Sequence, residues 1–321
     1  MVSSNFKMRW TVRVGLAALA AGIVVLVFYF TVDGRYADIS QLSPKKRYMT
    51  VDYHNEGRIG HLMFHFASLV GIATTNNFTP VMFPEPPFEL HTLFHVPMLY
   101  LRYQDRGLLK TNEFYENQQT IYDNRTENLK SLFPGNVAIS GLFQSWKYFK
   151  NVQTDLRKRF TFLPHVNRAV KDFFVNAVPR HWWKYPRVGI HIQRKSILSE
   201  EQSNWGYSAA PVDYYDRAIK FFRKKLGRHI LFVVVTDDIA WAKEFVKPIH
   251  VVYSEGNTEH IDFAILSFMH HSIMSSGTFG WWSSWLANGT TVYYKDSVKQ
   301  LSAINEDFKI DDHFPPTWVA M

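Results

Sequence analysis

Apolar residues follow two different periods along the second half of the chain. A short apolar strand is predicted at Arg187–Gln193 and a continuous one at Ile230–Val235, with an amphipathic helix between them at Pro211–Leu226 that Gly227 ends. The alternation continues, with helices expected at 240–246, 261–269 and 279–287 and strands at 249–253, 272–275 and 291–294. Strands that alternate with helices of this length predict a parallel, doubly wound sheet.

The first half begins with the same pattern. Tyr48–Tyr53 alternates as a strand does, Asn55-Glu56-Gly57 is a turn sequence, and Leu62–Thr74 carries apolar residues at helical spacing. We therefore expect two α/β domains, at 48–180 and 181–321. Because such sheets bind ligands beyond the carboxyl ends of their strands, polar residues just after each strand are the candidates for a site.

A long apolar segment precedes these domains. No charged residue occurs between Gly15 and Val32, and eighteen helical residues at about 1.5 Å each nearly span a bilayer core. A cleaved signal peptide is the alternative, but its apolar stretch is usually shorter, roughly 7–15 residues. Cations precede the segment, so the positive-inside rule places residues 1–14 in the cytoplasm. We expect a transmembrane signal-anchor at 15–32, a stem at 33–47 and a luminal remainder.

Composition narrows the function classes. The 321 residues are 46% hydrophobic, enough for one large core or two modest ones. The formal net charge of +8 suits nucleic acid, anionic lipid or a phosphorylated small molecule. The chain has no cysteine, which excludes thiol catalysis, Cys-based zinc sites and disulfides. Three Asn-x-Ser/Thr sequons, at Asn77, Asn124 and Asn288, are candidate glycosylation sites in a luminal protein.

Cations and hydroxyls follow several of the predicted strands. Gly57-Arg58-Ile59-Gly60-His61 combines a glycine turn with an Arg that could bind a phosphate, although a turn with a solvated Arg explains it as well. His191-Ile192-Gln193-Arg194-Lys195-Ser196 places two cations at a strand end, which suits a diphosphate leaving group. Ser275-Ser276-Gly277-Thr278 opens a helix with hydroxyl and N–H groups, and could cradle a diphosphate or simply cap the helix.

Acidic residues at the remaining strand end have two interpretations. Asp237 and Asp238 could accept hydrogen bonds from a nucleoside, or cap the following helix. No Asp-x-Asp pair occurs, so a metal bridging a nucleotide diphosphate has no obvious ligands, and the adjacent His270 and His271 are better explained as structural. P-loop, dinucleotide-binding and hydrolase-elbow motifs are also absent.

Together these segments resemble the galactoside α-1,2-fucosyltransferase family, glycosyltransferase family 11, of which the chain looks like a divergent member. The similarity runs from about Tyr48 to Tyr294. Five blocks in order carry it: Gly57–His61 with Ala67, Phe83–Leu93, Gly141–Phe149, Val188–Arg194, and Asp262–Ala264 followed by Ser272–Trp281.

The resemblance implies a GT-B-like fold of two Rossmann-like, doubly wound domains. It also implies transfer of fucose from GDP-fucose to the 2-hydroxyl of a galactose on a glycoprotein or glycolipid glycan. The transfer would be inverting and metal-independent, with no cofactor and no nucleic-acid partner. The enzyme would be a single-pass type II protein of the Golgi membrane.

By position, the resemblance assigns roles to individual residues. Arg194 and the Ser275–Thr278 turn would hold the diphosphate, and Asp238 and Asp262 the nucleotide. A base is expected to assist the acceptor hydroxyl, and Glu200 and Glu201 are the candidates. The other expected substrate-binding residues are Arg58, His61, His191, Gln193, Asp237, Ser275, Ser276 and Thr278. Acceptor specificity is expected between about Leu93 and Phe143.

The chain departs from the family pattern at the strand end. The family's strand ends His-x-Arg-Arg-x-Asp, whereas Gln193 and Ser196 replace the first Arg and the Asp, and His61 replaces an Asn. Losing a charge-assisted contact would cost roughly 2–4 kcal/mol of transition-state stabilisation. An active fucosyltransferase is the leading hypothesis. A silent relative that binds nucleotide or glycan without turnover, and a transferase with another donor, are the alternatives.

Overall fold

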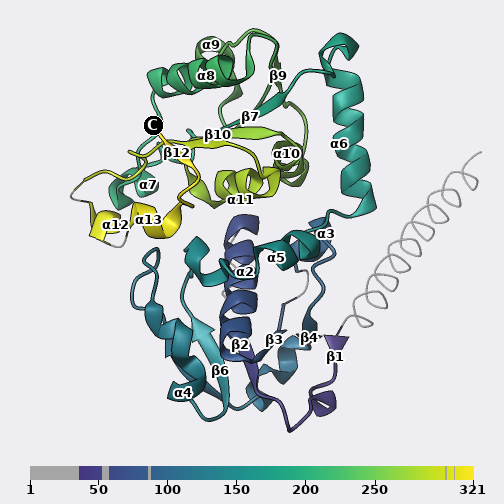
Figure 1. The fold of residues 1–321 in the computed structure, drawn as a ribbon, viewed down its shortest axis with the longest axis vertical. Coiled ribbons are helices and arrows are strands. Elements are labelled where there is room, and N and C mark those ends of the chain that lie inside the picture. The colour runs from purple at the N-terminus through teal and green to yellow at the C-terminus, as the bar shows by residue number, and fades with distance from the viewer. Residues whose placement is uncertain (1–35, 53–57, 86–87, 301, 307) are drawn as a thin grey trace, which may run out of the picture.

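Two parallel sheets form the framework of the protein. The computed structural model describes residues 36–52, 58–85, 88–300, 302–306 and 308–321. Within them the chain forms two six-stranded sheets, whose paired strands are all parallel, with helices packed around them (Figure 1). The predicted α/β class with parallel sheets is confirmed.

The first sheet has the strand order β1-β4-β3-β2-β6-β5. Its two central strands are β3 and β2, and β2 also pairs with β6, where Met49 lies opposite Val137. The bounds are β1 Tyr36–Ala37, β2 Tyr48–Asp52, β3 Thr79–Met82, β4 Leu99–Leu101, β5 Thr111–Tyr115 and β6 Asn136–Ser140.

The second sheet has the order β12-β11-β10-β7-β8-β9. The chain runs outward from β7 to β9, then restarts on the other side of β7 with β10. This reversal is a topological switch point, where open α/β sheets bind their ligands. The bounds are β7 Arg187–Ile192, β8 Leu231–Thr236, β9 Val251–Tyr253, β10 His271–Met274, β11 Thr291–Tyr293 and β12 Val319–Ala320.

Helices of the first half pack around α2, which is buried along most of its length because its sequence is apolar on nearly every side. It ends at Asn77, whose left-handed backbone (φ 58°) forms the C-cap. The helices are α2 Ile59–Asn76, α3 Leu90–Leu93, α4 Leu129–Leu132, α5 Gln153–Arg159 and α6 Pro164–Ala177. The 3₁₀ turns are η1 Ile39–Gln41, η2 Tyr103–Leu108, η3 Asn124–Asn128, η4 Trp146–Phe149 and η5 Arg180–Trp182.

Helices of the second half cover both faces of its sheet, with α8 and α9 on one face and α10 and α11 on the other (Figure 1). The Gly227 stop is confirmed, since this residue is the C-cap of α8 at φ 89°. The bounds are α7 Glu200–Trp205, α8 Val212–Leu226, α9 Ile239–Phe245, α10 Glu259–Ser267, α11 Gly277–Ala287, α12 Ala303–Glu306 and α13 Ile310–His313.

One apolar core joins the two halves. The Phe64 ring of α2 lies 4.8 Å from Trp281 and 5.0 Å from Trp282 of α11, and Phe149 stacks on Trp282 at 5.4 Å. All four side chains are fully buried. Because burying large aromatic rings is strongly favourable, this packing holds the starts of α2 and α11 against each other.

The carboxy-terminal segment crosses back to the first half. The Asp312 carboxylate of α13, 2% exposed, accepts a hydrogen bond from the Tyr122 N–H at 3.0 Å and pairs with the Lys147 ammonium. The Ser145 hydroxyl donates to the Asp312 carbonyl. A segment from the end of the chain therefore helps to fix loops of the first half.

The structure describes only part of the predicted amino-terminal tail, anchor and stem. Residues 36–47 belong to the fold and not to an extended stem, because β1 pairs with β4 and η1 follows it. The predicted anchor at 15–32 and the tail at 1–14 lie outside the described residues. Among the helices that the structure describes, none is both long and apolar enough to cross a membrane. The predicted boundary at residue 180 falls between the last strand of the first sheet and the first strand of the second.

Candidate active site

The tips of β7 and β10 are joined at the switch point. The backbone N–H of Gln193 donates to Ser275 Oγ at 2.9 Å, and the N–H of Ser275 donates to the His191 carbonyl at 3.1 Å. The polar residues that follow these two strands are therefore brought together, as the strand pattern predicted.

Two adjoining hollows open at this edge, with volumes of about 640 and 270 Å³. Residues from both halves line them, so the site lies between the sheets. Residues common to the two are Arg58, Gln193, Ser196, Glu259 and Phe279. The larger hollow is also lined by His61, Gln119, Gln144, Glu201, Ser276, Thr278 and His313, and the smaller by His191, Asp237 and Asp262.

The amino ends of α2 and α11 meet at the larger hollow. Neither helix has a side-chain cap on its first N–H groups, and the buried Ser276 hydroxyl has no hydrogen-bond partner among the described residues. A Cβ built on Gly60 would lie 2.5 Å from Thr278 Oγ1, so only glycine permits this approach. Two uncapped helix amino ends directed at one space form an anion-binding arrangement.

Arg58 lines both hollows. It precedes α2, and its Nη1 lies 4.0 Å from Glu259 Oε1 of α10, with both side chains more than half exposed. Such an exposed ion pair contributes little to stability, so the guanidinium is available to a ligand. The sequence expectation that Arg58 faces the site agrees with its position.

Asp237 organises the loop after β7. Its carboxylate accepts hydrogen bonds from the N–H groups of Arg194, Lys195 and Ser196 at 2.7–3.1 Å, and from the Ser196 hydroxyl at 2.8 Å. Burial alone would raise the pKa of Asp237, but these hydrogen bonds outweigh it and hold the pKa below its usual value. Asp237 lines the smaller hollow, yet its hydrogen bonds go to the loop.

Arg194 does not line either hollow. Its guanidinium lies 4.5 Å from the centre of the Trp241 ring, and its Nε is 3.7 Å from the Asp238 carboxylate. Asp238 also caps α9 through the Trp241 N–H at 3.4 Å, and it is absent from both linings. The structure thus directs Arg194 and Asp238, the expected ligands of diphosphate and nucleotide, toward each other.

Gln193 faces the site, where the resemblance led us to expect an Arg. Its Oε1 is buried without a hydrogen-bond partner among the described residues, and a Cβ on Gly277 would lie 2.2 Å from that atom. His191 is stacked on Phe279 with ring centres 5.3 Å apart, and burial lowers the pKa of His191 to about 4. Both residues therefore present neutral groups near neutral pH.

The remaining predicted residues differ in their exposure to the hollows. Burial, with the Arg58 charge, lowers the pKa of His61, and its Nδ1 has no partner among the described residues. Burial raises the pKa of Asp262, although this carboxylate accepts a hydrogen bond from Ser254 Oγ at 2.6 Å. Glu201 lines the larger hollow and Glu200 does not, so only Glu201 of the two base candidates lies at the site.

One wall of the larger hollow contains residues that the sequence did not point to individually. Gln144 lies in the Gly141–Phe149 block, and its carbonyl contacts His313 Nδ1 at 2.9 Å. Burial lowers the pKa of His313 to about 4. Nothing in the sequence around His313 indicates this position, because α13 reaches the site only through the return of the chain.

Glu116 supports this wall through hydrogen bonds to residues near Gln144. Its carboxylate accepts hydrogen bonds from the Phe143 N–H at 2.8 Å and from the Tyr148 hydroxyl at 2.9 Å, and burial raises the pKa of Glu116 to about 8. The bond to Phe143 holds that residue in a left-handed conformation, φ 49°, next to Gln144. The region expected to set acceptor specificity thus contributes a fixed loop to the hollow.

Across the described part of the chain, no group of three or more His, Asp or Glu side chains could hold a metal ion. The sequon residues Asn77, Asn124 and Asn288 are all exposed.

The family model of glycosyl transferase family 11 matches residues 21–321. The chain belongs to this family. The family 11 chain is 26% identical over 270 residues to galactoside alpha-(1,2)-fucosyltransferase 2 of Sus scrofa, covering 83% of this chain and 78% of the relative. It is 27% identical over 277 residues to galactoside alpha-(1,2)-fucosyltransferase 1 of Oryctolagus cuniculus, covering 84% and 72%. Together with the family, these relatives classify it as a fucosyltransferase enzyme.

Solved structures support the fold of this family 11 enzyme. An Arabidopsis thaliana FUT1 variant in complex with GDP matches with a TM-score of 0.51 at 12% identity, covering 82% of this chain and 72% of that one. The apo form of POFUT1 matches with a TM-score of 0.50 at 11% identity, covering 79% and 99%. At this identity the similarity concerns the fold alone, which agrees with the GT-B-like expectation.

Proposed function

We propose that this fucosyltransferase moves L-fucose from GDP-fucose to the 2-hydroxyl of a galactose on a glycan. The observation that carries the proposal is the meeting of the α2 and α11 amino ends beside Arg58, at the switch point of the second sheet. Helix amino ends and a guanidinium stabilise the negative charge that develops on a departing diphosphate. The names of the relatives, and the GDP complex of the structural neighbour, support the donor and the linkage.

In this mechanism the protein forms no covalent bond to the sugar; it stabilises charge and accepts a proton. As the bond between fucose and diphosphate breaks, positive charge develops on the sugar and negative charge on GDP, and the two helix ends with Arg58 stabilise the GDP charge. The acceptor hydroxyl attacks from the opposite face of the sugar, which inverts its configuration. Its proton passes to a base, for which Glu201 is the candidate that lines the hollow. No step requires a metal.

The proposal extends to the location of the enzyme. The anchor at 15–32 and the cations before it would make this a single-pass type II protein of the Golgi membrane with its sheets in the lumen. The stretch between that anchor and the fold is short, since β1 begins at Tyr36. Protease protection of the fold in sealed Golgi vesicles, lost on adding detergent, is the expected result.

The test of the activity uses the full chain in detergent. We expect GDP release and fucosylated product from GDP-fucose with a terminal β-galactoside, in buffer containing EDTA, and none with the same galactoside methylated at O-2. The proton spectrum of the product should show an α-fucosyl linkage. GDP-mannose and UDP-galactose serve as donor controls.

Two outcomes would contradict the proposal. Tight GDP binding with no transfer to any β-galactoside would favour a silent relative. Equal transfer to the O-2-methylated galactoside would show that another hydroxyl accepts the sugar.

A further inference from the structure

A groove of about 350 Å³ lies at the opposite end of the second sheet from the active site. It runs between α6 and the amino ends of β7 and β8. Its chemistry comes from Asn167, Lys171 and Phe174, which share one face of α6, and from Trp183 and Arg187. Arg187 begins β7 and Gln193 follows its end, so at about 3.3 Å per residue the two places are roughly 20 Å apart.

The groove combines flat rings with the positive groups of Arg187 and Lys171. Arg187 Nη2 contacts His270 Nε2 at 3.0 Å. Trp183 is 48% exposed, and its indole N–H donates to the Val178 carbonyl at 3.0 Å, which holds the ring in place. The Arg187 guanidinium lies 5.1 Å from the centre of the Phe174 ring, and its buried Nε has no hydrogen-bond partner among the described residues. No acidic residue of the described part of the chain lines the groove.

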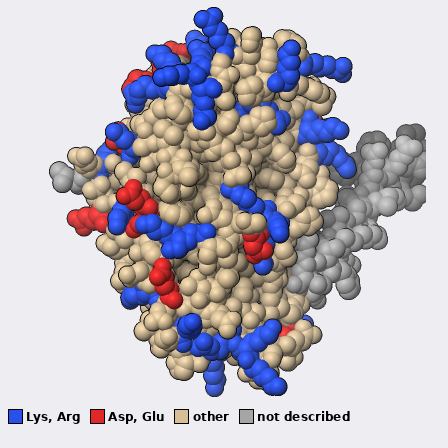
Figure 2. All heavy atoms as spheres, viewed as in Figure 1, with Lys and Arg blue, Asp and Glu red and all other residues tan. Residues whose placement is uncertain are grey.

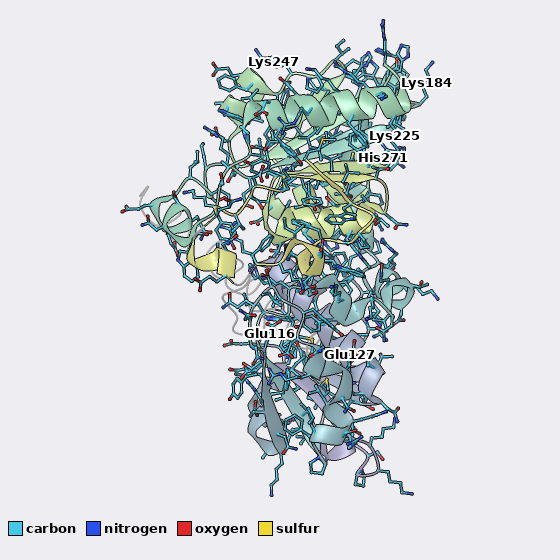
Figure 3. The ribbon with its side chains drawn as sticks, turned by 60° about the vertical axis from the view of Figure 1, so that its left-hand side comes forward. Glu116, Glu127, Lys184, Lys225, Lys247 and His271 are labelled. Carbon is cyan, nitrogen blue, oxygen red and sulfur yellow. The ribbon has the colours of Figure 1, made fainter. Side chains whose placement is uncertain are left out.

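Further cations surround the groove at this end of the molecule. Lys184 follows Trp183. Lys225 lies in the last turn of α8 near His271, whose pKa falls through burial and the charges of His270 and Lys225. Figure 3 shows Lys184, Lys225 and His271 together at this end, far from Glu116 and Glu127, and Figure 2 shows Lys and Arg side chains gathered there. Several Lys and Arg residues at this end form no ion pair within the described residues: Arg180, Lys184, Arg187, Arg223, Lys224, Lys225, Arg228 and Lys247.

The positive charge of the chain is therefore not concentrated at the active site. The two hollows contain Arg58 but also Glu201, Glu259, Asp237 and Asp262, whereas the described lining of the groove contains Lys171 and Arg187 with no Asp or Glu. A patch of one sign attracts and holds ligands of the other sign. The excess charge thus fits a second, anionic ligand better than it fits the sugar nucleotide.

We propose that the groove binds one residue of an anionic glycan, a saccharide bearing sulfate or carboxylate groups, and that the surrounding cations bind its neighbours along the chain. The C–H face of a sugar ring packs on Trp183, and its acidic group pairs with Arg187 and Lys171. A lipid chain would leave the buried Arg187 Nε unpaired, because an acyl chain offers no acceptor. The site is independent of the transfer reaction proposed above.

The test measures binding of a fluorescent heparin hexasaccharide to the full chain by anisotropy, in a polyoxyethylene detergent with 150 mM NaCl. The protein is deglycosylated first, because a glycan on Asn288 would occupy an adjoining groove that shares Asn167 and Phe268. We expect saturable binding at least tenfold tighter than that of maltohexaose, unchanged by excess GDP. Both Trp183→Ala and Lys171→Gln should weaken it about fivefold or more.

The matched control removes two exposed cations elsewhere. Lys45→Gln with Lys46→Gln, on the first half, should change binding by less than twofold. The proposal is overturned by an absence of saturable binding, by an equal effect of the control pair, or by competition with GDP. It is also overturned if Trp183→Ala and Lys171→Gln have no effect while their unfolding temperatures match the parent. Binding to phosphatidylcholine–phosphatidylserine vesicles in place of the hexasaccharide would assign the surface to membranes instead.

Discussion

Gln193 donates its backbone N–H to Ser275 Oγ over 2.9 Å, and this bond ties β7 to β10 where the strand order reverses. The side chain of Gln193 is left facing the hollows with an unpartnered Oε1. A neutral amide therefore occupies the place where the resemblance led us to expect a guanidinium.

Gln193→Arg should raise the affinity for GDP. The backbone bond to Ser275 stays, and the new charge enters the space beside the α11 amino end, so we expect roughly tenfold tighter binding from one charge-assisted hydrogen bond. Calorimetric titration with GDP measures it. Gln119→Arg adds the same charge to the opposite wall and should have a smaller effect. Unchanged GDP affinity and transfer in Gln193→Arg would mean that this strand end does not face diphosphate.

Arg58→Ala should reduce transfer far more than Arg194→Ala. Arg58 lines both hollows, whereas Arg194 rests on Trp241 beside Asp238. Loss of a cation that stabilises the leaving group should lower kcat/KM by roughly 10²-fold. Steady-state kinetics on both variants decides the order. The reverse order would show that Arg194 leaves Trp241 and enters the site when the donor binds.

Gly60→Ala should destabilise the protein and reduce activity. The added Cβ would lie 2.7 Å from the Thr278 backbone carbon, which cannot move without shifting the start of α11. We expect a cost of about 1–3 kcal/mol in the free energy of unfolding, measured by urea denaturation. Gly107→Ala is the control, because nothing lies within 4 Å of its Cβ. Equal stability of the two variants would rule out a tight α2–α11 contact.

Asp237→Asn should weaken the loop after β7. An amide retains one acceptor oxygen, so the second oxygen's hydrogen bonds to Ser196 are lost, at about 1–3 kcal/mol of stability. We expect the KM for the donor to rise with it, because Ser196 and Gln193 line the hollows. Asp238→Asn, which removes only the partly exposed pair with Arg194, should cost less than about 1 kcal/mol. If Asp238→Asn lowers the stability more than Asp237→Asn does, Asp237 is not the residue that organises the loop after β7.

Acid should destabilise the fold through its buried histidines. The pKa of His313 is about 4 in the fold and near 6.5 when unfolded, so between these values the unfolded chain binds more protons and stability falls as the pH falls. The stability is fully present above about pH 6.5, and the loss reaches about 3 kcal/mol near pH 4. His313→Asn should remove that part of the pH dependence, as read from urea unfolding at pH 7 and pH 4.5. His181→Asn, which changes an exposed ring, should leave the pH dependence intact.

The sequence predicted the elements well where the apolar period was regular. The helix expected at 211–226 is α8 at Val212–Leu226, and the strand expected at 230–235 is β8 at Leu231–Thr236. Because parallel strands end at one edge of a sheet, the same pattern placed Gln193 next to Ser275. The irregular segments were predicted less well: residues 36–47 gave no periodic signal, yet β1 is held there by pairing with β4.

The sequence by itself determined the two α/β units, the family, and which strand ends carry polar residues, because periodicity and local motifs are properties of neighbouring residues. Only the tertiary structure decided the directions of the side chains: Arg194 turns onto Trp241, Asp237 binds the backbone, and His313 returns from the end of the chain. It also brought Lys171 of α6 and Arg187 of β7 to one groove at the amino ends of β7 and β8. These outcomes depend on atoms far apart in the chain, whose packing no local pattern records.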